Sequence, residues 1–164
     1  MSTNDLHILK WYADATFAMH LDFKSHMGGG LTLGVGMSHK QKLNTTSSTI
    51  AELVEANNLS GPILWTKLFM EAQGYKIKKN ILYQDNKSTI LLENNGKASS
   101  SSRMRAVNIR YFFLTDQVNQ RNLSISYCPT GDMIADFFSK PMQGNLFHKF
   151  CNQIMGYTSV SSPM

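Results

Sequence analysis

Residues 82–89 read LYQDNKST, and within this stretch the sequence changes from one predicted element to the next. The apolar run ILYQ favours a β-strand, whereas KSTILLENN at 87–95 has the spacing of a short helix. Asp85 is therefore predicted to lie at the tip of a strand. A carboxylate in that position either caps the following helix or joins other acids in a shared site. The other acids of the chain decide between these interpretations.

Two patterns upstream of this stretch predict further strands. Residues 7–15 (HILKWYADA) favour a strand that ends near Asp14. Residues 31–45 resemble a hairpin with its turn around Gly34 and Gly36. The sequence therefore begins with three predicted strands.

Helical spacing follows at 47–59, where Ser47 or Ser48 is the expected N-cap. The pair Gly61–Pro62 interrupts this pattern. Since proline is tolerated in a first helical turn, a second helix is predicted to start there and to end at Gly74. Two helices are thus expected before the strand that leads to Asp85.

The second half of the chain begins with a serine-rich, basic segment at 96–105, which is expected to be an exposed loop. Beyond it the patterns predict a helix at 108–118, a strand at 123–129, a helix at 131–140 and a helix at 144–156. Strands first and then helices alternating with strands indicate an α/β fold with a mixed sheet. We expect one domain at 1–156 and a flexible tail at 157–164.

Composition restricts the class of protein. The 164 residues are 42% hydrophobic, and the chain has no run approaching the roughly 20 apolar residues of a membrane span. We expect a soluble intracellular domain in which Cys128 and Cys151 are reduced thiols, since neither has a partner at metal-ligand spacing. The net charge of +5 favours a polyanionic partner.

Four of the 11 acidic residues occupy positions where an unpaired carboxylate is costly. Asp14 and Asp85 end predicted strands, and Glu52 and Asp136 lie between apolar residues on predicted helices. We find no lysine or arginine locally placed to pair with either helical acid. Each acid taken singly is explained by a turn cap or a solvated helix face, but a shared divalent metal site explains all four.

Several motifs carry a resemblance to a known family. The segments YADA, KSHMGG, SHKQKLNTTSSTIAEL, LYQDNKST, SSRMRAVNIRYFF, ISYCPTGDMIADFFSKPM and LFHKF occur in this order over roughly residues 9–156. Together they resemble the ribonuclease H domain of copia-type retrotransposon polyproteins. The resemblance implies a ribonuclease H-like fold, with a five-stranded mixed sheet and helices on both faces. It also implies endonucleolytic hydrolysis of the RNA strand of an RNA–DNA hybrid.

The resemblance also implies roles for particular residues. Asp14 would bridge two Mg²⁺ ions, for which Mn²⁺ can substitute, with Asp136 on the first ion and Glu52 and Asp85 on the second. The first ion would activate water, and the second would stabilise the departing 3′ oxygen. The expected nucleic-acid contacts are Lys24, Ser25, Asn86, Lys87, Arg103 and Arg105. The expected partners are the hybrid and the reverse transcriptase part of the same polyprotein, in the cytoplasm or in a virus-like particle.

The chain departs from the family pattern at several positions. Ile50 replaces a glutamate, residues 105–108 replace a Lys-His-Ile-Asp motif, and the hairpin after KSHMGG is short. No histidine precedes Asp136 in the segment where cellular ribonucleases H have one that helps product release. Two alternatives therefore stay open. One is a nucleic-acid-binding remnant without turnover, and the other is a polynucleotidyl transferase or exonuclease of the same fold.

Overall fold

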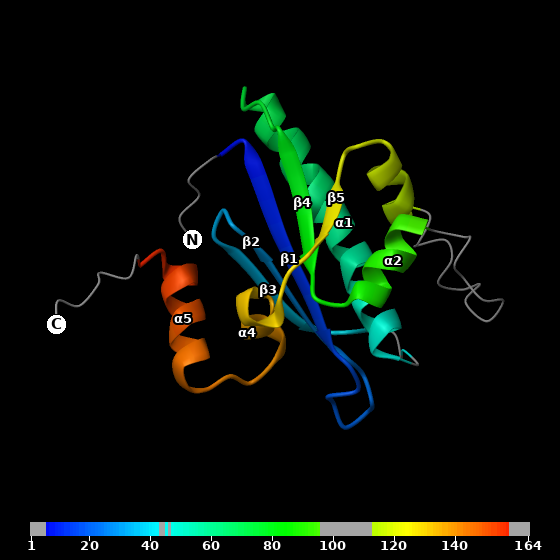
Figure 1. The fold of residues 1–164 in the computed structure, drawn as a ribbon, viewed down its shortest axis with the longest axis vertical. Helices are drawn as coiled ribbons and strands as arrows, with labels where there is room; N and C mark the ends of the chain where they lie inside the picture. Colours follow the sequence, from blue (N-terminus) through cyan, green and yellow to red (C-terminus); the bar gives the residue numbers. More distant parts are fainter. Residues whose placement is uncertain (1–5, 43–44, 46, 96–112, 158–164) are drawn as a thin grey trace.

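The computed structural model describes residues 6–42, 45, 47–95 and 113–157, and their strands form one five-stranded sheet (Figure 1). The strand order is β3-β2-β1-β4-β5. Neighbours among the first three strands are antiparallel, and β4 runs parallel to both β1 and β5. The predicted mixed sheet is thus confirmed. The strands are β1 (Ile8–Thr16), β2 (His26–Leu31), β3 (Val35–Lys40), β4 (Lys79–Gln84) and β5 (Ser124–Tyr127).

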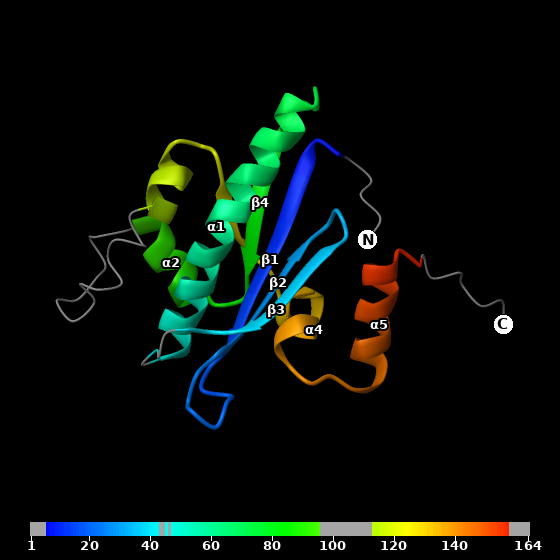
Figure 2. The same cartoon turned by 180° about the vertical axis from the view of Figure 1, so that it is seen from behind.

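Helices cover both faces of this sheet (Figures 1 and 2). A Cβ atom added to Gly28 would touch the backbone around α4, whereas one added to the next residue, Gly29, would touch α1. Because successive strand residues face opposite sides, α1 and α4 lie on opposite faces. Helix α5 lies beside α4. The helices are α1 (Ser48–Ala72), α2 (Lys87–Asn95), the 3₁₀ turn η3 (Thr130–Asp132), α4 (Asp136–Ser139) and α5 (Gly144–Met155), and residues 113–119 are also helical.

The main core lies between the sheet and α1. Leu9, Trp11 and Ala13 of β1 are buried there against Leu59 and Ile63 of α1. The alternation along β1 therefore turns Tyr12 and Asp14 toward the opposite face, where α4 packs. The strand pattern alone decides on which face the Asp14 carboxylate lies.

The prediction of two helices around Pro62 is wrong, because α1 continues through this residue to Ala72. Leu59 and Ile63, on either side of the Gly61–Pro62 pair, are both buried in the core, while the pair itself is exposed. Packing of one apolar face thus outweighs a proline that costs about 3 kcal/mol in an isolated helix.

The predicted hairpin is present and its turn includes Gly34 as predicted, but the prediction that Gly36 belongs to the turn is wrong. The turn occupies residues 32–34, Gly36 lies within β3, and β2 begins as early as His26. Three consecutive glycines at 28–30 carry no β-favouring side chain, and this hides β2 from a propensity-based prediction. Similarly, the helix predicted at 131–140 is split into η3 and α4.

Local signals at helix ends are confirmed. The Ser47 side chain accepts a hydrogen bond from the Ile50 amide and caps α1, and α2 spans the predicted residues 87–95. Gly74 and Gly156 have positive φ values of 90° and 74° where α1 and α5 end. The predicted loop at 96–105 and the tail after Tyr157 lie outside the described residues. In the described ranges, no helix combines the length and apolar character that a membrane crossing needs.

Candidate active site

Asp14 lies near the end of β1, and its side chain is only 3% exposed. Its neighbour across the antiparallel pair is Gly28, which lets α4 approach the sheet closely. One carboxylate oxygen of Asp14 accepts a hydrogen bond from the Ser139 hydroxyl, and the other lies 3.1 Å from the Lys140 Nζ atom. Asp14 is therefore a buried carboxylate held by two residues at the end of α4, Ser139 and Lys140.

Asp85 directly follows β4, the parallel neighbour of β1, so the two strands end at the same edge of the sheet. The cap of α2 is Asn86, whose Oδ1 atom accepts hydrogen bonds from the amides of Ser88 (2.9 Å) and Thr89 (3.3 Å). The Asp85 carboxylate instead accepts a bond of 3.3 Å from the Thr130 hydroxyl. The helix-cap interpretation of Asp85 is thus wrong, and its carboxylate is available to the site.

Asp136 is the first residue of α4, and its side chain is 3% exposed. Two hydrogen bonds fasten α4 to the sheet: Thr16 Oγ1 donates to the Ser139 carbonyl at 3.1 Å, and Ser38 Oγ donates to the Phe138 carbonyl at 2.7 Å. These bonds hold Asp136 opposite the end of β1.

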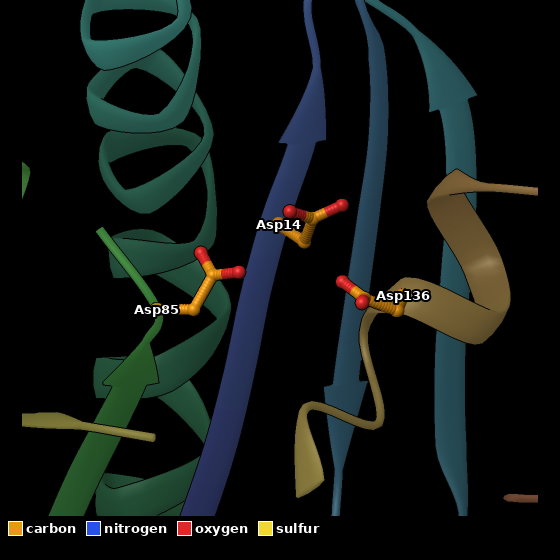
Figure 3. A group of neighbouring side chains, drawn as sticks. All are labelled: Asp14, Asp85 and Asp136. Atoms are coloured by element: carbon orange, nitrogen blue, oxygen red, sulfur yellow. The ribbon is translucent and has the colours of Figure 1, made fainter. Parts of the chain in front are cut away.

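The three aspartates converge although they come from distant parts of the chain. One oxygen from each of Asp14, Asp85 and Asp136 lies within 4.8 Å of the others, and the three carboxylates face a common space (Figure 3). All the donors in this cluster are carboxylate oxygens, and hard divalent cations prefer oxygen ligands. The cluster therefore fits a metal ion in its chemistry and in its spacing.

Glu52, the fourth predicted acid, is close to the cluster but does not belong to it. It lies on α1, and its two oxygens accept hydrogen bonds from Asn86 Nδ2 (3.2 Å) and Thr89 Oγ1 (3.3 Å). Burial and the charges of Asp85 and Asp14 raise the pKa of Glu52 to about 7, against the lowering effect of the Asn86 hydrogen bond. The structure thus brings three of the four predicted metal ligands together.

The cluster carries more negative charge than its surroundings can easily accommodate. Burial, together with the charges of Asp14 and Asp85, raises the pKa of Asp136 to about 6, although Lys140 acts in the opposite direction. The raised pKa shows that the ionised form of Asp136 is disfavoured in this site. A bound cation would stabilise the ionised carboxylate, so the site favours cation binding.

Lys140 is the main correction to the sequence analysis. Its Nζ atom lies 2.9 Å from Asp136 and 3.1 Å from Asp14, so the helical acid does have a locally placed cation. The spacing of four residues between Asp136 and Lys140 is the signal that could have revealed this pair. Its contact with Asp14, 126 residues away, had no signal in the sequence.

Glu55 is a buried acid that the sequence analysis did not select. It is fully buried on α1, facing β2 near Gly29, and neither carboxylate oxygen has a hydrogen-bond partner among the described residues. Burial and the charge of Asp14 raise the pKa of Glu55 to about 8. Glu55 is therefore protonated near neutral pH and lies on the side of the sheet opposite the cluster.

The predicted nucleic-acid contacts lie in different environments. Ser25 is fully buried and bonds to Thr45, which contradicts its predicted contact with nucleic acid. Asn86 caps α2, while Lys87 is exposed and lies 5.0 Å above the Tyr127 ring. The partly exposed ammonium of Lys24 lies 3.7 Å from Asp22. Arg103 and Arg105 lie outside the described residues.

The sequence is similar to one segment of much longer proteins. It is 29% identical over 157 residues to the retrovirus-related Pol polyprotein from transposon TNT 1-94 of Nicotiana tabacum, which covers 93% of this chain and 12% of the relative. It is 32% identical over 124 residues to the corresponding polyprotein from transposon RE1 of Arabidopsis thaliana, which covers 75% of this chain and 8% of the relative. The chain thus spans only about a tenth of these relatives.

The fold is similar to that of solved ribonucleases H. LC11 ribonuclease H1, isolated from compost by a metagenomic approach, superposes with a TM-score of 0.52 at 13% identity, covering 80% of this chain and 91% of that one. The same enzyme in complex with an RNA/DNA hybrid gives a TM-score of 0.55 at 13% identity, covering 79% and 92%. No protein-family model matches the sequence.

Proposed function

Since the chain is homologous to one segment of the retrovirus-related Pol polyproteins of plant transposons and has the ribonuclease H fold, we propose that it is a nuclease hydrolysing the RNA strand of RNA–DNA hybrids. The family resemblance and the fold predicted from the sequence motifs are both confirmed. The observation that carries the proposal is the convergence of Asp14, Asp85 and Asp136 at one end of the sheet.

The residues present fit a divalent metal site. Asp14, Asp85 and Asp136 would hold Mg²⁺, or Mn²⁺ in its place, and Glu52 is the proposed fourth ligand where two ions are bound. Two such ions supply charge stabilisation for the attacking and leaving oxygens of a phosphodiester. The protein supplies the positions of the four carboxylates.

Residues around the acids keep these positions. Ser139 holds Asp14 by a hydrogen bond, and Asn86 and Thr89 orient Glu52. Because Asn86 also caps α2, it connects the orientation of Glu52 to the turn that carries Asp85. Pre-set carboxylates need little rearrangement during the reaction, which is how such sites lower a barrier.

Substrate recognition is proposed to follow from charge and from the ribose. Lys24, Lys87, Arg103 and Arg105 are the proposed contacts to phosphates, in agreement with the net charge of +5. The strand to be cut is proposed to be chosen by its 2′-hydroxyl groups, which only RNA offers as donors and acceptors. The proposed protein partner is the reverse transcriptase part of the same polyprotein.

A cleavage assay with matched variants tests the proposal. Labelled hybrid, duplex DNA and duplex RNA are incubated with wild type, Asp14→Asn and Asp132→Asn, each in Mg²⁺ and in EDTA. Asp132 is a suitable control because its exposed carboxylate pairs with Lys149. We expect wild type and Asp132→Asn to cut the RNA of the hybrid in Mg²⁺ alone, and Asp14→Asn to lose at least a hundredfold in rate.

One specific observation favours a second candidate function. The Lys140 ammonium contacts both Asp14 and Asp136 and offsets part of their charge, as a cation replacing the metal in a binding module without turnover would do. Folded wild type that binds the hybrid but cuts nothing at any Mg²⁺ concentration would support this module. Cleavage of duplex DNA instead would support the transferase or exonuclease class.

A further inference from the structure

Lys140 occupies the part of the candidate site that a metal ion would need. Its ammonium group lies between two buried carboxylates, 3.1 Å from Asp14 and 2.9 Å from Asp136, and both belong to the cluster of three. Of the lysines paired with acids in the described residues, the other three contact only exposed aspartates: Lys24 and Lys40 contact Asp22, and Lys149 contacts Asp132.

The backbone fixes where the Lys140 side chain starts. Lys140 directly follows α4, and its amide donates a hydrogen bond of 2.9 Å to the carbonyl of Asp136. The chain becomes extended at this residue, with φ −131° and ψ 143°. The same short helix therefore presents both Asp136 and the cation that neutralises it.

Lys140 also has a route out of the site. Its side chain is 34% exposed, whereas those of Asp14 and Asp136 are each 3% exposed. A lysine ammonium is a compact charge on a flexible stem of four carbons, so it can turn toward water without movement of the backbone. The side chains of Asp14 and Asp136 are short and buried, so they stay in the site when Lys140 turns outward.

From this arrangement we infer that the Lys140 ammonium is the internal counter-ion of the metal-free site and competes with divalent metal for Asp14 and Asp136. The inference rests on the proposed function, because it takes the cluster to be a metal site. Without metal, Lys140 relieves the repulsion between two buried carboxylates. When a metal ion binds the same two carboxylates, the ion and the Lys140 ammonium repel each other, and the ammonium moves out toward solvent.

This exchange makes Lys140 a positioning residue that sets metal affinity. Its removal abolishes the competing cation, so the metal binds more tightly. Its removal also leaves two buried negative charges without their cationic partner, so the metal-free fold becomes less stable. A purely structural ion pair differs in this respect, since its loss lowers stability equally with and without metal and leaves the affinity unchanged.

Calorimetric titration with Mn²⁺ tests the inference on wild type, Lys140→Gln, Lys140→Arg and Lys149→Gln. Lys149 is the matched control because it pairs at 2.6 Å with Asp132, outside the cluster. We expect Lys140→Gln to bind Mn²⁺ about tenfold more tightly, and Lys140→Arg and Lys149→Gln to stay within about twofold of wild type. Lys140→Gln should also melt at a lower temperature in EDTA and show the largest rise on addition of Mn²⁺.

A measurement on wild type covers the case in which Lys140→Gln does not fold. Amine acylation followed by mass spectrometry reports how exposed each lysine is, and Mn²⁺ should increase the labelling of Lys140 several-fold while Lys149 stays constant. Unchanged labelling of Lys140, or unchanged affinity in Lys140→Gln while wild type binds Mn²⁺, would overturn the inference and leave the proposed function standing. Absence of Mn²⁺ binding in wild type would overturn both.

Discussion

Replacing Gly28 by alanine tests whether the packing of α4 on the sheet builds the site. Gly28 is the register partner of Asp14, and a Cβ atom there would lie 2.6 Å from the carbonyl oxygen of Ala135 and 2.8 Å from the amide nitrogen of Ser139. Both are backbone atoms, so no side-chain rotation relieves the clash. Helix α4 must therefore move away from β2, and it carries Asp136 with it.

The clash should lower both the stability of the fold and its affinity for Mn²⁺. Overpacking of this kind costs about 1–3 kcal/mol, which lowers the melting temperature by about 3–10 °C in a protein of this size. Because Asp14 and Asp85 stay on the sheet while Asp136 moves, the affinity for Mn²⁺ should fall about tenfold, a loss of about 1.4 kcal/mol.

Gly29→Ala is the matched control for this prediction. Its Cβ would lie 3.0 Å from a methyl group of Leu59 on the opposite face, so it should lower stability without displacing α4. Thermal melting in EDTA and calorimetric titration with Mn²⁺ on both variants give the comparison. Equal Mn²⁺ affinities in Gly28→Ala and Gly29→Ala would refute the idea that α4 positions a metal ligand.

Three further predictions concern charge. Asp85→Asn should remove most of the rise in melting temperature that Mg²⁺ causes, and an undiminished rise would exclude Asp85 as a ligand. The folded pKa of Glu55, about 8, exceeds its ordinary value of 4.5, so its favourable contribution is complete below about pH 4.5 and is lost as the pH rises through 8. Urea denaturation should therefore show Glu55→Gln gaining about 3 kcal/mol on wild type between pH 5 and pH 8, and parallel pH profiles would contradict this. Arg105→Ala should reduce the salt slope of hybrid binding by roughly 0.7 to 0.9, whereas equal slopes would indicate a merely solvated loop.

Local signals in the sequence account for the elements that were predicted well. The alternation along β1 gives both the strand and the face of Asp14, and the limits of α2 follow from polar residues before a periodic apolar run. These signals act between residues close in sequence. They also place Asp14 and Asp85 at strand ends, where a fold with adjacent parallel strands brings them together.

Features that depend on tertiary packing were missed. The glycines of β2 have low strand propensity, yet the close approach of α4 on one face and α1 on the other leaves no room for larger residues at Gly28 and little at Gly29. Helix α1 runs through Pro62 because Leu59 and Ile63, on either side of the Gly61–Pro62 pair, are buried in the core. In both cases long-range contacts outweigh local preference.

The candidate site shows the same division. The acids were found from their apolar surroundings, but the way in which each carboxylate is held was not. Asn86 rather than Asp85 caps α2, and Asp136 pairs with Lys140, although no locally placed lysine was expected for it. A carboxylate with apolar neighbours in sequence signals a need for compensation, and only the fold shows which group provides it.

The central claim is that Asp14, Asp85 and Asp136 form one metal site. Anomalous diffraction from crystals of the wild-type protein soaked in Mn²⁺ tests it most directly, because the position of the ion is then observed independently of activity. We predict an anomalous peak in contact with all three carboxylates and a Lys140 side chain turned away from Asp14 and Asp136. A map without a peak at the cluster, with the Lys140 ammonium still between the two aspartates at saturating Mn²⁺, would contradict the account.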